Sequence, residues 1–154
     1  MKQVLTLITL MLFSVSALAQ EIANCRSPKG KAFYFNLGIV QKNSAGWGDD
    51  AISGGVFTLS KKDGEFDILY LDSSKRIVSS RASGAVIQPL RKGENNFTLM
   101  VYYANDTIEL YTFAKEKSGV QSVHIIQSKG GDAMVQKSSI MIANCDYIKF
   151  DALK

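Results

Sequence analysis

Apolar and polar residues alternate in short runs along most of the chain, and the spacing of three to four residues that marks a helix rarely persists. Clusters of Gly, Asp, Asn and Ser separate these runs, as in chains built from strands and tight turns. The pattern predicts about eight to nine strands, with candidates at residues 31–39, 55–60, 66–72, 76–81, 84–90, 97–103, 107–115, 122–128 and 135–143. We therefore expect an antiparallel all-β fold.

Three short segments have the composition of hairpin turns. Asp63-Gly64 separates two alternating runs, which is the strongest short signal for a hairpin, and Asn105-Asp106 and Gly130-Gly131 occupy similar positions. Consecutive strands should then pair as a meander. The predicted strands at 66–72 and 97–103 are apolar on both faces, which indicates either a second covering layer or an apolar binding surface. We expect a closed barrel or a sandwich whose ends are tied together.

The first 19 residues have the pattern of a secretory signal peptide. Lys2 precedes an apolar stretch, and Ala17-Leu18-Ala19 forms a small-x-small cleavage site. The apolar stretch at 4–13 is shorter than the roughly 20 residues that a membrane-spanning helix needs. We expect a periplasmic or secreted protein with one β domain over residues 20–154 and no transmembrane segment after cleavage.

The chain contains two cysteines, Cys25 and Cys145. In an exported protein such a pair indicates a disulfide bond, which here ties the two ends of the predicted domain. The alternative is a thiol or metal site, but neither cysteine has a histidine or a third cysteine near it in the sequence. We expect a structural bond.

Charge narrows the class of partner only slightly. The chain has 18 Lys and Arg against 14 Asp and Glu, and one of the basic residues, Lys2, lies in the leader. Basic residues alternate with acidic ones, so no basic stripe indicates a nucleic-acid partner. The mild positive balance permits attraction to anionic components of a cell envelope.

Few residues are suited to catalysis. The single histidine, His124, lies in a predicted strand, so a Ser-His-Asp or Cys-His arrangement and a zinc site both lack candidates. Acid–base chemistry by two carboxylates is open to Asp63, Glu65 and Asp67. Asp49 and Asp50 point in opposite directions on an extended backbone, which disfavours a dyad. We expect no catalytic residues, no metal and no cofactor.

The segment GWGDDAISGG, residues 46–55, contains the one tryptophan of the chain, Trp47, and four of its 12 glycines. The glycines indicate a shaped loop that leads into the following strand. In the favoured interpretation, the indole of Trp47 is buried and closes one end of the barrel or sandwich. In the other, Trp47 anchors a recognition loop with Asp49 and Asp50 beside it.

A second segment gives a partial resemblance to a known family. Ala82-Ser83-Gly84-Ala85 and Lys92-Gly93 are similar to the Ser-Gly-x-x-Tyr and Lys-Gly elements of bacterial periplasmic lysozyme inhibitors, although position 87 is Ile where that pattern has Tyr. Those inhibitors are small exported β proteins with disulfides. The resemblance implies inhibition of, or immunity to, a cell-wall hydrolase.

These observations predict a non-catalytic exported β domain that binds a protein or an envelope component through loops at one end. The candidate contact residues are Trp47, Asp49, Asp50, Ser83 and Lys92. One alternative is the hydrolase inhibitor. Another is a carrier of a small apolar ligand, with a cavity lined by strand residues such as Phe66, Tyr70, Leu99 and Tyr102.

Overall fold

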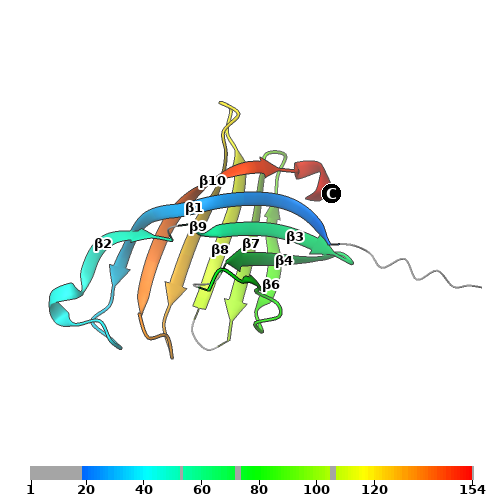
Figure 1. Cartoon of the computed structure of the whole chain (residues 1–154). Helices are drawn as coiled ribbons and strands as arrows, with labels where there is room; N and C mark the ends of the chain where they lie inside the picture. Colours follow the sequence, from blue (N-terminus) through cyan, green and yellow to red (C-terminus); the bar gives the residue numbers. More distant parts are fainter. Residues whose placement is uncertain (1–18, 53, 72–73, 105–106, 154) are drawn as a thin grey trace, which may run out of the picture.

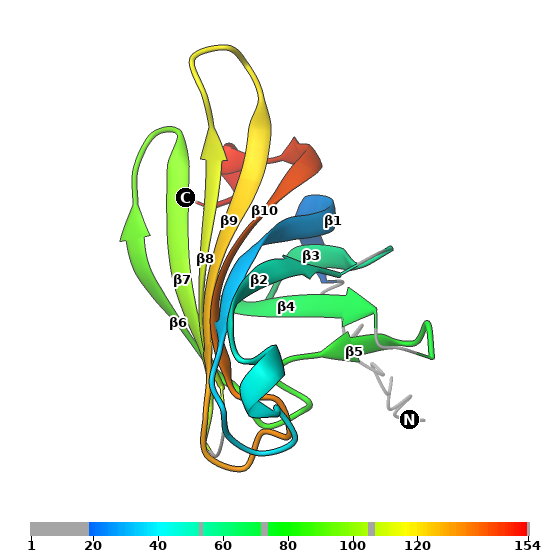
Figure 2. The ribbon, with the colours of Figure 1, turned by 90° about the vertical axis from the view of Figure 1, so that its left-hand side faces the viewer.

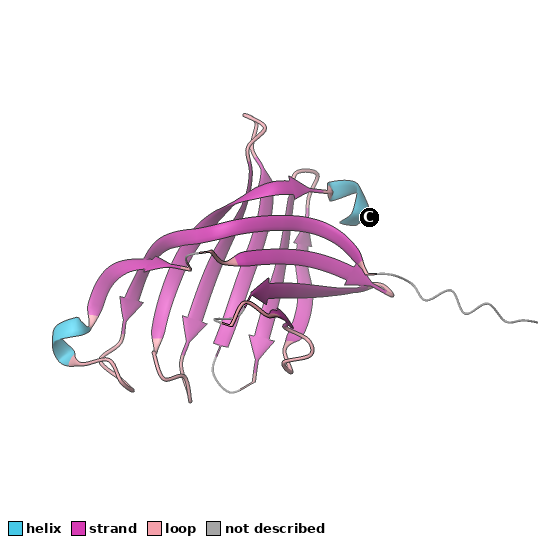
Figure 3. Cartoon of the chain, in the orientation of Figure 1, coloured by secondary structure: helices cyan, strands magenta, loops and turns pink. Residues whose placement is uncertain are grey.

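The computed structural model describes residues 19–52, 54–71, 74–104 and 107–153, and most of them lie in strands (Figure 3). The strands are β1 (Gln20–Tyr34), β2 (Gly46–Ala51), β3 (Val56–Lys62), β4 (Glu65–Leu71), β5 (Ile77–Ser79), β6 (Val86–Lys92), β7 (Asn96–Tyr103), β8 (Thr107–Lys115), β9 (Gln121–Lys129) and β10 (Lys137–Ile148). Two short 3₁₀ helices, η1 (Lys42–Ser44) and η2 (Phe150–Leu153), are the only helices in these ranges. The predicted all-β class is confirmed, whereas the predicted leader, apart from Ala19, lies outside the described residues.

All ten strands belong to one antiparallel sheet with the order β5-β4-β3-β1-β10-β9-β8-β7-β6, and β2 pairs with β1 beside this path. β3 to β5 form one meander and β6 to β10 form another, as the hairpin signals at Asp63-Gly64 and Gly130-Gly131 predict, whereas Asn105-Asp106 lies outside the described residues. The turn at Asp63-Gly64 has positive φ at both residues, 52° and 85°, which is the backbone of a tight hairpin. The two meanders meet where β1 pairs with β10, so the first and last strands are neighbours.

Figures 1 and 2 show that the sheet curls into a half-barrel. Its curvature brings β4 back towards the opposite end of the order, and the rings of Phe66 on β4 and Phe97 on β7 lie 5.0 Å apart. Among the described residues, no pairing joins the edge strands β5 and β6, so the expected closed barrel or sandwich is not confirmed. β5 has three residues, and Pro89 and a register shift interrupt β6, so neither edge offers a long ladder.

β1 is long because two different strands pair along one of its edges. Residues 20–26 of β1 pair with β3 and residues 29–34 pair with β2, while β10 follows the other edge. The register shifts between the two halves, where Ser27 has a φ of 51°. Gly30 lets the strands approach here, because a Cβ on it would lie 1.8 Å from the carbonyl oxygen of Ile140.

β2 overturns the interpretation of GWGDDAISGG as a loop. Residues 46–51 form a strand in register with β1, with Trp47 opposite Phe33. Gly and Asp are uncommon in strands, so the composition indicated a turn. The strand forms because the edge of β1 that β3 leaves uncovered supplies partners for its backbone groups.

The core lies on the concave face of the sheet, where side chains such as Leu59, Ile68, Leu99, Phe113 and Val123 are buried. The convex face carries a second apolar row, in which Met100, Leu110, Ile126 and Ile140 are cross-strand neighbours on β7 to β10. This row explains why several strands are apolar on both faces. No second layer of described residues covers it, and Ile126 and Ile140 are exposed.

Candidate functional site

The concave face contains a cavity of about 400 Å³, within the range of roughly 300–1,000 Å³ that is usual for small-molecule sites. Its wall comes from β3, β4 and β7 to β10, together with the segments that follow β2 and precede β6. Apolar side chains form a large part of this wall, namely Ile52, Phe57, Leu71, Ile125 and Met141. The half-barrel therefore has a concave hollow of the size of a small organic molecule.

A buried carboxylate lies in the wall of this cavity. Glu109 on β8 is 9% exposed, and its two oxygens accept hydrogen bonds from the phenol of Tyr111, at 2.8 Å, and from the side-chain amide of Gln127. Gln127 is the direct partner of Glu109 on β9, and the alternation of β8 places Tyr111 on the same face as Glu109. Since burial of a carboxylate is costly unless donors surround it, Gln127 and Tyr111 make this position tolerable.

Tyrosines surround the carboxylate. Tyr70, Tyr103 and Tyr111 all line the cavity, and the phenol of Tyr103 donates to the hydroxyl of Ser80 at 2.9 Å. Burial raises the pKa of the Tyr103 phenol, and the charge of Glu109 raises it further. The same two causes raise the pKa of Tyr111 well above its usual value. Both phenols are therefore neutral hydrogen-bonding groups at physiological pH.

The polar row of Glu109 and Gln127 continues onto β10, outside the residues that line the cavity. Ser139 on β10 is the direct partner of Gln127 and lies on the same face as the buried Met141. Its hydroxyl is buried and has no hydrogen-bond partner among the described residues. An unpaired buried hydroxyl costs free energy, so Ser139 is a second buried polar group on this face of the sheet.

Sequence reasoning missed Glu109, Gln127 and Ser139. A signal for Glu109 did exist, because positions 107, 109, 111 and 113 share one face of the strand and the other three are Thr, Tyr and Phe. A carboxylate inside such a row is a buried polar residue that needs explaining. Of the residues proposed for a carrier cavity, Tyr70 lines it, whereas Phe66 and Leu99 lie in the core and Tyr102 lies at a different surface depression.

Trp47 is 76% exposed, so the favoured interpretation of a buried indole that closes the fold is wrong. Its ring meets that of Phe33 edge to face at 5.6 Å, and Phe33 meets Phe35 at the same distance. On the same face of β2, the carboxylate of Asp49 pairs with Lys31 at 2.6 Å. The exposed tryptophan is thus part of a small aromatic patch formed by Phe33, Phe35 and Trp47.

Asp50 points to the opposite face from Asp49, as predicted. It forms an ion pair with Lys137 of β10, and the two side chains are 9% and 14% exposed. The phenol of Tyr34 lies 3.4 Å from the Asp50 carboxylate. Because β1 separates β2 from β10, this pair fastens β2 to the sheet.

Ser83 and Lys92 lie at opposite ends of β6. Ser83 is in the turn before the strand and lines the cavity, whereas Lys92 is the last residue of the strand and lies beside a different depression. The hydroxyl of Ser83 donates to the carbonyl of Ser79 at 2.9 Å and closes the turn. The five residues named as contacts are therefore distributed over the two faces of β2, the cavity rim and the far end of β6.

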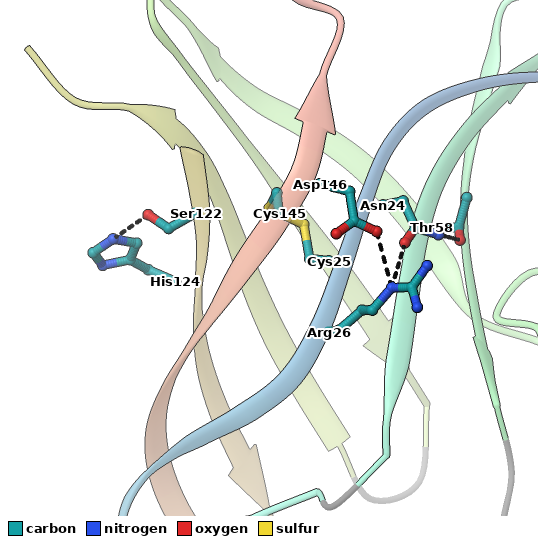
Figure 4. The surroundings of a disulfide bond; sticks show 8 residues. All are labelled: Asn24, Cys25, Arg26, Thr58, Ser122, His124, Cys145 and Asp146. Carbon is teal, nitrogen blue, oxygen red and sulfur yellow. Dashed lines mark hydrogen bonds and ion pairs between the residues drawn. A yellow bond between two sulfur atoms is a disulfide. The ribbon is translucent and has the colours of Figure 1, made fainter. Parts of the chain in front are cut away.

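The predicted disulfide is confirmed. Cys25 and Cys145 are direct partners in the pairing of β1 with β10, and they are bonded (Figure 4). Beside them, Arg26 pairs with Asp146 at 2.9 Å, which is a second link between the same two strands. The bond joins the two central strands of the sheet and does not contribute to the cavity wall.

The other candidate catalytic groups contact neighbouring residues of the sheet and its turns. His124 is near the hydroxyl of Ser122, at 3.2 Å, on the convex side of β9 (Figure 4). Asp67 accepts from Ser79 and from the backbone of Arg81, and Glu65 lies 3.6 Å from the Arg81 guanidinium. In the part of the chain that the structure describes, no three His, Cys, Asp or Glu residues are arranged to hold a metal ion.

Comparison of the chain with protein-family models, with curated proteins and with solved structures found no significant match. No helix among the described residues is long and apolar enough to span a membrane. Function is therefore inferred from the geometry of the cavity and of the aromatic patch.

Proposed function

We propose that this protein is an exported, non-catalytic binding domain that holds a small, partly apolar molecule in the concave cavity of its half-barrel. The observation that carries the proposal is the buried pair of Glu109 and Gln127 in the cavity wall, beside apolar side chains. Binding sites for small molecules combine such walls with a few fixed polar groups. Export is supported by the leader pattern and by the disulfide, which is typical of oxidising compartments.

A binding role agrees better with this cavity than hydrolysis does. Hydrolysis by carboxylates needs two such groups across a cleft, and Glu109 is the one carboxylate among the described residues of the wall. Its oxygens already accept two hydrogen bonds from neutral donors, which hold it in place. A fixed acceptor of this kind orients a bound molecule.

Titration with N-phenyl-1-naphthylamine, a neutral dye that fluoresces in apolar sites, tests the proposal on the purified, disulfide-intact protein. We expect saturable binding, and we expect Ile52→Trp to weaken it by about fivefold or more because the larger side chain occupies the cavity. Ile77→Trp is the matched control, because Ile77 is exposed on β5 outside the cavity wall. Equal effects of the two variants, or no saturable binding, would count against the cavity as the binding site.

A second function, contact with a protein or an envelope component, is favoured by the aromatic patch of Phe33, Phe35 and Trp47. Exposed aromatic side chains are enriched where proteins bind partners. Crosslinking in envelope extracts tests this, with Trp47→Ser as the variant and Ile77→Ser as the control. The expected result is a crosslinked partner that Trp47→Ser removes and Ile77→Ser retains.

A further inference from the structure

The cavity wall has one acidic group, Glu109, and no ion pair among the described residues neutralises it. Glu109 is nine-tenths buried, and both of its hydrogen-bond donors, Tyr111 and Gln127, are neutral. Among the described residues, no Lys or Arg nitrogen forms an ion pair with its carboxylate. A carboxylate can accept about four hydrogen bonds, so Glu109 retains capacity for a further donor. A cationic donor would also compensate its buried charge.

The surrounding groups are those that favour a cation. The rings of Phe57, Tyr70, Tyr103 and Tyr111 line the same space, and the rings of Phe57 and Tyr111 lie 6.1 Å apart. Aromatic faces attract cations, and neutral phenol oxygens accept hydrogen bonds from them. Ile125 and Met141 supply apolar surface for hydrocarbon substituents.

Two lysines on this side of the sheet must be accounted for. Lys137 is held by Asp50 in a buried ion pair. Lys129 lines the cavity opposite Thr107, one step along the face from the pairing of Gln127 with Glu109. Its ammonium group is the one cation among the described wall residues; it forms no ion pair with Glu109, and its charge disfavours a second cation in the same cavity.

We propose that the cavity binds a small organic ammonium ion, whose charged nitrogen pairs with Glu109 and whose hydrocarbon part lies against Phe57, Ile125 and Met141. This inference rests on the proposed function and specifies the chemical class of its ligand. It predicts a preference for positive charge that an apolar cavity alone would not produce.

Three molecules with the same hydrocarbon body and different polar groups test the inference by isothermal titration calorimetry at pH 7. They are 4-phenylbutylamine, 4-phenylbutanol and 4-phenylbutyrate, which carry an ammonium, a hydroxyl and a carboxylate. We expect the amine to bind at least about tenfold more tightly than the alcohol, as a charge-assisted hydrogen bond in a buried site provides, and the carboxylate to bind most weakly.

The variant Glu109→Gln keeps the shape of the side chain and removes its charge. We expect it to lower the affinity for the amine at least about tenfold and to change that for the alcohol less than about threefold. Glu116→Gln is the matched control, because Glu116 is exposed in the turn between β8 and β9 and should leave all three affinities unchanged. Unchanged binding of the alcohol to Glu109→Gln also demonstrates that the cavity is intact.

A second variant keeps the test decisive if Glu109→Gln does not fold. Lys129→Met removes the ammonium that repels a ligand cation in the same cavity, so it should strengthen amine binding by about twofold or more. Unchanged or weaker amine binding to Lys129→Met would overturn the inference.

The failures of the two proposals are distinguishable. If the alcohol or the carboxylate binds as tightly as the amine, or if Glu109→Gln retains the preference for the amine, the cation inference is overturned and the binding role stands. If none of the three molecules binds and the naphthylamine dye does not bind either, both proposals fail.

Discussion

Glu109 and Trp47 reverse the usual relation between residue type and burial. The carboxylate is buried on the concave face and the indole is exposed on β2. Composition predicted the reverse for Trp47 because large apolar side chains are usually buried. Sequence alone could not place Trp47, since the burial of a strand residue depends on which face the rest of the sheet covers. For Glu109, the residues at 107, 111 and 113 on the same face gave the one available signal. By contrast, the opposite directions of Asp49 and Asp50 follow from strand alternation and were predicted.

The exposure of Trp47 has a direct optical consequence. We expect its fluorescence to resemble that of a fully solvated indole, with acrylamide quenching close to that of N-acetyltryptophanamide, because it is the one tryptophan of the chain and is 76% exposed. A blue-shifted emission that acrylamide quenches poorly would mean that the aromatic patch is covered.

Comparing two tyrosines measures how much the hydrogen bond to Glu109 contributes to the free energy of unfolding. Tyr111 donates to Glu109 in the buried cavity wall, and Tyr147 donates to Glu21 at 2.7 Å where water has access. Tyr111→Phe should lower the free energy of unfolding by about 1.5–3 kcal/mol, since it removes a buried hydrogen bond to a charged group. Tyr147→Phe should cost less than about 1 kcal/mol because water replaces the lost bond. Urea unfolding of both variants measures the difference, and equal costs would contradict the burial argument.

At the scale of the elements, hairpins were predicted well and β2 was not. Asp63-Gly64 specifies a turn by its own backbone preferences, so the β3–β4 hairpin is readable from local sequence. β2 depends on a distant strand, because its backbone partners lie on β1 and its anchor, Lys137, lies on β10. Contacts between residues so far apart in the sequence leave no pattern in the sequence of β2 itself.

The ion pair of Asp50 with Lys137, which fastens β2 to the sheet, should contribute to stability. Lys137→Met should lower the free energy of unfolding by about 3 kcal/mol or more, because it leaves the Asp50 carboxylate buried without its cation. Lys31→Met removes the exposed ion pair with Asp49 and should cost less than about 1 kcal/mol. Chemical unfolding of the two variants compares them. A loss as small for Lys137→Met as for Lys31→Met would show that the pair with Asp50 does not hold β2 in place.

At the scale of the whole molecule, the sequence predicted the all-β class and the disulfide. It did not predict that the sheet curls into a half-barrel. The curl of the sheet depends on the packing of side chains such as Phe66 and Phe97 from opposite ends of the strand order. That packing produces the hollow in which the candidate site lies. The candidate site thus depends on the packing of distant strands, which explains why no local sequence motif predicted it.

The disulfide is the whole-molecule link that is simplest to remove. Its cysteines are 120 residues apart, so chain-entropy arguments give a ceiling of roughly 4–5 kcal/mol for its contribution to stability. We expect Cys25→Ala with Cys145→Ala to lower the free energy of unfolding by about 2–5 kcal/mol. Thermal and urea unfolding measure this loss, and the reduced native chain is the control that should behave like the double variant. A loss below about 1 kcal/mol would mean that the pairing of β1 with β10 is sufficient by itself.

The pairing of β1 with β10 also determines when the sheet can be completed as the chain is synthesised. Of the strands that the structure describes, β1 is synthesised first and β10 last, and the two are neighbours in the middle of the sheet. Contacts between distant parts of a chain form slowly. The half-barrel cannot be completed before residues 137–148 have been made, because β1 has its partner for this edge only on β10.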